Sequence, residues 1–164
     1  MTVQTSLELE FAGGDYSFDL RLPQMQELEE KCGRGIFAVY ADILQGRYVY
    51  EGVTIGATNE AVARIADIRQ VIRLGLIGGG SGFVDGERVV VDANMARRLV
   101  ERHVDGAPLR DSWAVAAAVL GARIEGYTPP GEAGAGESPA PSTSEPTGDS
   151  SSPTAPSSEP IGEV

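Results

Sequence analysis

The first 22 residues alternate between apolar and polar side chains on both sides of a pair of glycines. The apolar positions are Val3, Leu7, Leu9 and Phe11 before the glycines, and Tyr16, Phe18, Leu20 and Leu22 after them. A two-residue turn at Gly13-Gly14 predicts a β-hairpin in which Phe11 pairs with Tyr16, Leu9 with Phe18 and Leu7 with Leu20. Every apolar side chain then lies on one face, and an isolated hairpin of this kind is unstable in water, so other elements must cover it.

Five later stretches repeat apolar residues at three- and four-residue spacing or lie between helix start and stop signals, which predicts a helix in each. They run from Pro23 to Gly33, from Ile36 to Gln45, from Thr58 to about Ile77, from Asp92 or Asn94 to Gly106, and from Pro108 to about Glu125. The segment from Arg47 to Ile55 suits either a short strand or an extended loop, and so does Phe83 to Val91, with a turn at Asp85-Gly86. The pattern predicts an α+β fold, with an N-terminal antiparallel β-hairpin packed on a small bundle of about five helices. Whether Arg47 to Ile55 joins the hairpin as a third strand is left open.

The composition changes abruptly near residue 129. From there to the end the chain contains no aromatic residue and no lysine or arginine, and it is dominated by Pro, Ser, Thr, Gly and Glu. Such a segment buries too little apolar surface to order, so we expect one folded domain over residues 1–128 and a disordered acidic tail over 129–164.

The charge argues against nucleic acid as a partner. Six of the 24 acidic residues and none of the 13 basic ones lie in the tail, so the first 128 residues carry a formal charge of −5. A negative domain with a negative tail is a poor match to a phosphate backbone. We also expect neither a signal peptide nor a membrane span, because the N-terminus lacks a basic region and no apolar run is long enough. A cytoplasmic protein is the simplest interpretation.

The residue types that carry chemistry do not form a recognisable catalytic site. The glycine run at 78–80 follows a helix, whereas a phosphate-binding loop precedes one, so we interpret it as a helix end. Cys32 is the only cysteine and His103 the only histidine. Neither stands in a nucleophile or metal-ligand pattern, and Glu27, Glu29 and Glu30 are typical of a solvated helix face. The sequence predicts no catalytic residue, no metal site and no cofactor.

Aromatic residues are concentrated in one short window, which includes Phe37, Tyr40, Tyr48 and Tyr50. They are either part of the core or part of a groove that binds another protein, since tyrosine is enriched at protein interfaces. Under the second interpretation, the candidate partner-binding residues are Phe37, Tyr40, Ile43, Tyr48 and Tyr50.

Two stretches resemble a known family. The segment FDLRLPQMQELEEKCG, residues 18–33, has a second hairpin strand that runs into a short helix and a glycine. The segment DIRQVIRLGLIGGG, residues 67–80, ends a helix with G-L-x-G-G, and the final helices follow in the same order. Over residues 3–126 the chain resembles small tail proteins of gene transfer agents and siphophages, which are often labelled tail tube proteins but look like tail assembly chaperones.

The resemblance implies a non-catalytic role in phage or prophage tail assembly. A chaperone of this kind would bind the tape measure protein, help tail tube subunits assemble around it, act in the bacterial host cytoplasm and be absent from the mature particle. Whether the protein forms a homo-oligomer is left open. A structural subunit of the tail is the main alternative, and a small regulatory or adaptor protein of a prophage is another. The long acidic tail is a departure from the family core.

Overall fold

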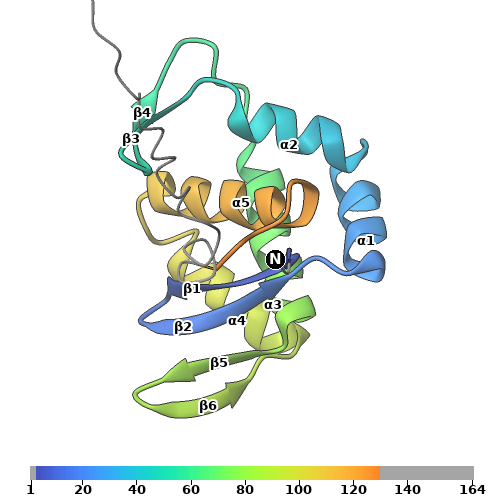
Figure 1. Cartoon of the computed structure of the whole chain (residues 1–164), viewed down its shortest axis with the longest axis vertical. Coiled ribbons are helices and arrows are strands. Elements are labelled where there is room, and N and C mark those ends of the chain that lie inside the picture. Colours follow the sequence, from blue (N-terminus) through green and yellow to red (C-terminus); the bar gives the residue numbers. More distant parts are fainter. Residues whose placement is uncertain (1–2, 130–164) are drawn as a thin grey trace, which may run out of the picture. The chain divides into compact units, whose positions relative to one another are not determined.

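The structure is a computed structural model and describes residues 3–129 (Figure 1). The order of elements is β1 (Ser6–Phe11), β2 (Gly14–Asp19), α1 (Leu22–Cys32), α2 (Ile36–Leu44), β3 (Arg47–Tyr50), β4 (Val53–Ala57), α3 (Ile65–Gly79), β5 (Ser81–Val84), β6 (Glu87–Val90), α4 (Ala93–His103) and α5 (Leu109–Ile124). The predicted α+β fold, with an N-terminal hairpin packed on five helices, is confirmed. The predicted disorder of residues 129–164 concerns a segment that, except for Pro129, lies outside the described residues.

The N-terminal hairpin forms, but its turn lies one residue earlier than predicted and its pairing is shifted by two residues. The turn consists of Ala12 and Gly13, with φ of 55° and 78°, and Phe11 pairs with Gly14 in place of Tyr16. Positive φ at both turn residues is the conformation whose twist matches that of the strands, and Ala12 adopts it despite its Cβ. Because a shift of two residues preserves which face each side chain occupies, the prediction of a single apolar face survives.

The hairpin is half of a larger sheet. The four strands lie in the order β1-β2-β5-β6, all antiparallel, with Gly82 of β5 paired to Tyr16 of β2. The segment from Phe83 to Val91 therefore contains strand structure, and Asp85-Gly86 forms its turn as predicted.

Helix α3 lies against this sheet and also packs on α1, α4 and α5. Its last turn touches the backbone of β2: a Cβ on Gly78 would lie 1.9 Å from the Asp19 carbonyl oxygen, and one on Gly79 would lie 1.9 Å from that of Ser17. The glycines near the helix end thus serve close packing, while Gly80, with φ of 69°, ends the helix.

The start of α3 differs from the prediction. Thr58 does not begin the helix, which starts at Ile65, because the chain from residue 58 to 64 crosses over Gly46 first. The Thr58 N–H donates to the Gly46 carbonyl oxygen at 2.8 Å, and a Cβ on Gly46 would lie 2.3 Å from the Ala61 nitrogen. Tertiary packing at Gly46 overrides the local helix signal.

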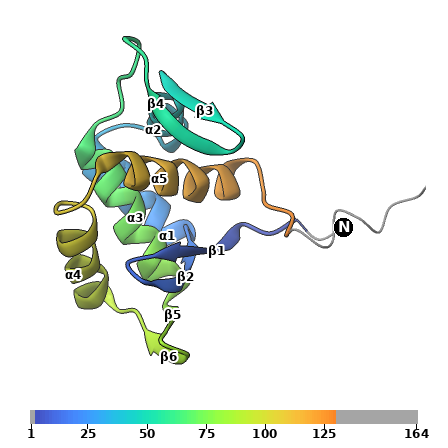
Figure 2. The same ribbon diagram turned by 90° about the vertical axis from the view of Figure 1, so that its left-hand side faces the viewer.

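The ambiguous segment from Arg47 to Ile55 belongs to a separate two-stranded sheet of β3 and β4 and does not join the N-terminal hairpin. Helix α5 contacts β4 as well as β1 and β2, so it lies between the two sheets, as both views show (Figures 1 and 2). Among the described residues, no helix is long and apolar enough to cross a membrane.

Candidate interaction surface

The sheet of β3 and β4 exposes most of its large apolar side chains. Tyr48, Val49, Tyr50, Val53 and Ile55 are 43–61% exposed. We call these five residues the exposed sheet. In the pairing register Tyr48 lies opposite Gly56 and Tyr50 opposite Val53, so Tyr48, Tyr50 and Val53 share one face. A Cβ on Gly56 would meet no atom within 4 Å, which leaves the space beside Tyr48 open.

The other face of this sheet is anchored to the domain. Thr54 is 2% exposed, and its hydroxyl oxygen accepts a hydrogen bond from Arg47 Nε at 2.7 Å. Burial lowers the pKa of the Arg47 guanidinium from its ordinary value, yet an arginine keeps its charge at neutral pH. One face is therefore held by α5 and these contacts, while the face with the two tyrosines is free to contact another molecule.

An apolar pocket of about 530 Å³ lies at the base of the sheet. Its lining residues are Gly56, Ala57, Ala61, Ala63, Ile65, Ile68, Leu109, Arg110 and Trp113. They come from β4, from the segment that crosses Gly46, and from the first turns of α3 and α5. The volume is within the range of protein sites that hold ligands or anchor side chains. We call this feature the base pocket.

The five predicted partner-binding residues do not form one groove. Tyr48 and Tyr50 belong to the exposed sheet, whereas Ile43 is fully buried in the core and has no surface to offer, so its assignment to a binding groove is wrong. The Tyr40 hydroxyl donates to Glu125 Oε1 at 2.7 Å, and burial, followed by this bond, raises the pKa of Tyr40 to about 12.

Phe37 is 71% exposed but lies on a different surface. It borders a hollow with Leu22 and Met25 of α1 and with Arg123 and Ile124 at the end of α5. The base pocket is at the other end of α5, a 16-residue helix that spans roughly 24 Å. Phe37 and the exposed sheet are therefore two separate apolar surfaces.

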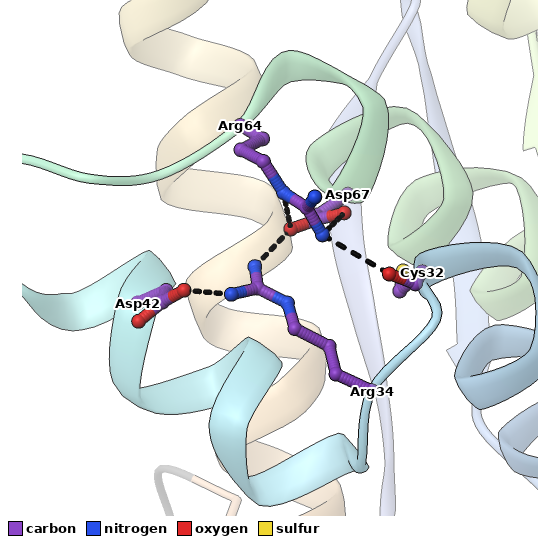
Figure 3. A network of polar contacts seen from close by, with 5 residues as sticks. All are labelled: Cys32, Arg34, Asp42, Arg64 and Asp67. Carbon is purple, nitrogen blue, oxygen red and sulfur yellow. Dashed lines mark hydrogen bonds and ion pairs between the residues drawn. The ribbon is translucent and has the colours of Figure 1, made fainter.

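A network of charged side chains lies beneath the start of α3 (Figure 3). Asp67 is 1% exposed and accepts hydrogen bonds from Arg34 and Arg64, with Arg64 Nε at 3.0 Å from Oδ2. Arg34 also pairs with Asp42 of α2, and Arg64 donates to the Cys32 carbonyl oxygen at 3.1 Å. The network links the end of α1, the last turn of α2 and the start of α3.

Burial by itself would raise the pKa of the Asp67 carboxyl. The hydrogen bonds from Arg64, Arg34 and the Cys32 thiol outweigh it, so the pKa of Asp67 is lowered from its ordinary value. Burial, then the Asp67 charge, raises the pKa of Cys32 to about 11. A thiol with such a pKa is protonated near neutral pH and is a poor nucleophile. The network is accordingly structural.

The described residues also offer little for metal binding, since no group of three or more His, Cys, Asp or Glu side chains among them converges on one point. His103 stacks edge-on against Phe11, with ring centroids 6.2 Å apart.

The sequence did not predict the base pocket, nor that the residues of the exposed sheet form one surface. The signal was present in Tyr48-x-Tyr50 and Val53-x-Ile55 on either side of Glu51-Gly52, which is the alternation of a short hairpin.

Comparisons with protein-family models, with curated protein sequences and with solved structures give no match to this chain.

Proposed function

We propose that the protein is a non-catalytic tail assembly chaperone of a phage, prophage or gene transfer agent. It binds the tape measure protein in the host cytoplasm, promotes assembly of tail tube subunits around it, and is absent from the finished particle. The observation that carries the proposal is the exposed sheet, where five large apolar side chains are 43–61% exposed and three of them, Tyr48, Tyr50 and Val53, share the outward face. Apolar patches of this kind mark sites of protein interaction.

The mechanism is shielding of apolar surface. An extended or helical apolar segment of the tape measure protein would lie across Tyr48, Tyr50 and Val53, and a large side chain would enter the base pocket. Burial of apolar area contributes about 25 cal/mol per Å² before the cost of association, so a modest contact keeps such a segment from aggregating. Tyrosines suit this role because they combine a large apolar ring with a hydroxyl that tolerates water.

The resemblance of residues 18–33 and 67–80 to tail assembly chaperones supports the tail as the setting of this activity. The described domain also supports binding in preference to catalysis, because its one cysteine is buried and the Asp67 carboxylate, whose pKa is lowered, is engaged by two arginines.

The experiment is co-expression of the tape measure protein with this chain, followed by measurement of the soluble tape measure protein and of its recovery in a pull-down. The double variant Tyr48→Ser/Tyr50→Ser removes two aromatic anchors, and we expect binding at least about tenfold weaker. Phe37→Ser is the control, since it removes an aromatic ring that is even more exposed (71% against 55% and 60%) from the other surface and should retain binding.

Two outcomes contradict the proposal. If the tape measure protein binds the double variant as well as the unaltered chain, the exposed sheet is not the binding surface. If mass spectrometry finds the protein in purified particles at a stoichiometry comparable to that of tail subunits, it is a structural tail protein, the alternative that the resemblance leaves open.

A further inference from the structure

The tip of the β3–β4 hairpin carries a carboxylate next to exposed apolar side chains, and these groups complement those of the base pocket. Tyr50, Glu51, Gly52 and Val53 form the turn and its flanks, and all four are exposed. Glu51 and Gly52 have φ of 48° and 80°, which makes a tight two-residue turn that projects the Glu51 carboxylate. Among the described residues no basic side chain forms an ion pair with Glu51.

The base pocket is apolar, and Arg110 is the one charged residue among the described residues that line it. The nearest carboxylate oxygen to the Arg110 Nε, that of the adjacent Asp111, is 3.8 Å away, beyond hydrogen-bond distance. Helix α5 starts at the same place without a side-chain cap, so its first N–H groups add partial positive charge. An occupant with an apolar side chain next to a carboxylate fits this pocket best, although the domain as a whole is acidic.

We propose that two copies of the chain associate about a two-fold axis through their β3–β4 hairpins, with the tip of each hairpin seated in the base pocket of the other. Tyr50 or Val53 enters the apolar pocket, and Glu51 pairs with Arg110 of the second copy. The partner is identified by charge complementarity between the Glu51 carboxylate, which forms no ion pair among the described residues, and the exposed Arg110 guanidinium, whose one carboxylate neighbour, Asp111, lies 3.8 Å from its Nε.

The hairpin geometry allows both contacts to form at once. Tyr50 pairs with Val53 near the tip, and Arg47 pairs with Ala57 at the base, so tip and pocket lie at opposite ends of the same element. The separation of these two pairs, three residues along β3 and four along β4, is about 10–13 Å at 3.3 Å per residue. Two hairpins that lie antiparallel therefore bring each tip to the base of the other, which is a closed, isologous arrangement.

The same arrangement covers the exposed sheet. The face with Tyr48, Tyr50 and Val53 would pack against its own copy, which removes apolar surface from water in each protomer. This association does not depend on the proposed chaperone role. If both hold, the dimer is the resting form and a tape measure segment competes for the same face.

The test is sedimentation equilibrium of the purified full-length protein over a micromolar concentration series, with circular dichroism to confirm that each variant is folded. Glu51→Arg and Arg110→Glu each place like charges together, and we expect each to weaken dimerisation at least about tenfold. The combined variant Glu51→Arg/Arg110→Glu restores opposite charges, and its dissociation constant should return to within about threefold of that of the unaltered protein.

Asp85→Arg is the matched control, because Asp85 occupies the corresponding turn position of the β5–β6 hairpin with φ of 51°. It should leave dimerisation unchanged. A protein that is monomeric throughout the series overturns the proposal, and so does a double variant no better than the single ones. Because the assay contains only this chain, its failure leaves the chaperone proposal standing, and failure of the tape measure protein to bind leaves the dimer standing.

Discussion

Replacement of Asp67 by asparagine tests whether the buried charge network holds the helices together. Asparagine keeps the size and one acceptor oxygen of the side chain but removes the charge that faces Arg34 and Arg64. Arg34 then keeps Asp42 as its one carboxylate partner, and Arg64 keeps only uncharged acceptors, among them the Cys32 carbonyl oxygen. The perturbation therefore acts on the contacts among α1, α2 and α3 without creating a cavity.

The expected loss in the free energy of unfolding follows from how exposed Asp67 and its two arginine partners are. Asp67 is 1% exposed, and the Arg34 side chain is 26% exposed, so this pair is largely shielded from water. The Arg64 side chain is 53% exposed, and its contribution must be discounted for solvent screening. Loss of one partner of a buried pair costs about 3–5 kcal/mol, and with one exposed arginine and a retained amide oxygen we expect about 2–3 kcal/mol. Because the whole free energy of unfolding of a typical protein is roughly 5–15 kcal/mol, this is a large effect.

Urea unfolding followed by fluorescence measures the loss. Trp113 is the only tryptophan, and its Nε1–H donates to the Ile43 carbonyl oxygen at 2.6 Å, so its emission reports on the packing of α5 against α2. Asp111→Asn is the control, because the Asp111 side chain is 75% exposed and its removal should cost less than about 1 kcal/mol. A loss below about 1 kcal/mol for Asp67→Asn would refute the reasoning.

The pH dependence gives a second readout of the same substitution. The pKa of Asp67 is lower in the folded protein than in the unfolded chain, where it is about 3.9. The unfolded state thus binds the proton more readily than the folded state. The stability that Asp67 contributes is therefore fully present above the unfolded pKa and is lost as the pH falls through the folded pKa. The stability difference between the unaltered protein and Asp67→Asn should shrink below about pH 4. A difference that is constant down to pH 2 would contradict this account.

Three further predictions concern single residues. Gly46→Ala should destabilise the protein in urea by about 1–3 kcal/mol more than Gly52→Ala, because both glycines have positive φ but only at Gly46 would a Cβ meet backbone atoms; equal losses would contradict this. Alkylation of Cys32 by iodoacetamide at pH 8 should be roughly a hundredfold slower than that of free cysteine and should accelerate in urea, since burial raises the pKa of Cys32 to about 11; equal rates with and without urea would refute it. Asp92→Ala should cost about 1 kcal/mol in the same urea assay, because the Asp92 carboxylate accepts from the Met95 N–H at 2.7 Å and caps α4; no change would show that this cap is dispensable.

The apolar pattern near the N-terminus predicted the hairpin because apolar residues alternate along the sequence with the same two-residue period as the buried side chains of the strands. Its register was not predictable from the pattern. Ala12-Gly13 and Gly13-Gly14 both place the apolar residues on one face, and the chain uses the first, with Ala12 at φ of 55°. A shift of two residues changes every pairing but no side-chain face, so only turn geometry separates the two alternatives.

The parts of the candidate site that sequence reasoning missed depend on contacts between distant segments. The base pocket joins Gly56, Ala63 and Trp113, and no local period connects them. The start of α3 is delayed because the chain packs on Gly46 before it turns helical, which the favourable start signal at Thr58 does not reveal. The sequence signals within one helix or strand therefore predicted that element, whereas surfaces built from several elements could not be predicted from them.

The aromatic window shows why residue type alone does not separate core from interface. Ile43 and Tyr48 are five residues apart and both apolar, yet one is fully buried and the other 55% exposed. The difference arises because α2 packs on α5 through Trp113 and the Ile43 carbonyl oxygen, whereas β3 has one face on the domain and the other in water. A two-stranded sheet with an apolar outer face gains little stability from its own pairing. The outward tyrosines therefore suit the two roles proposed above, in each of which another molecule covers them.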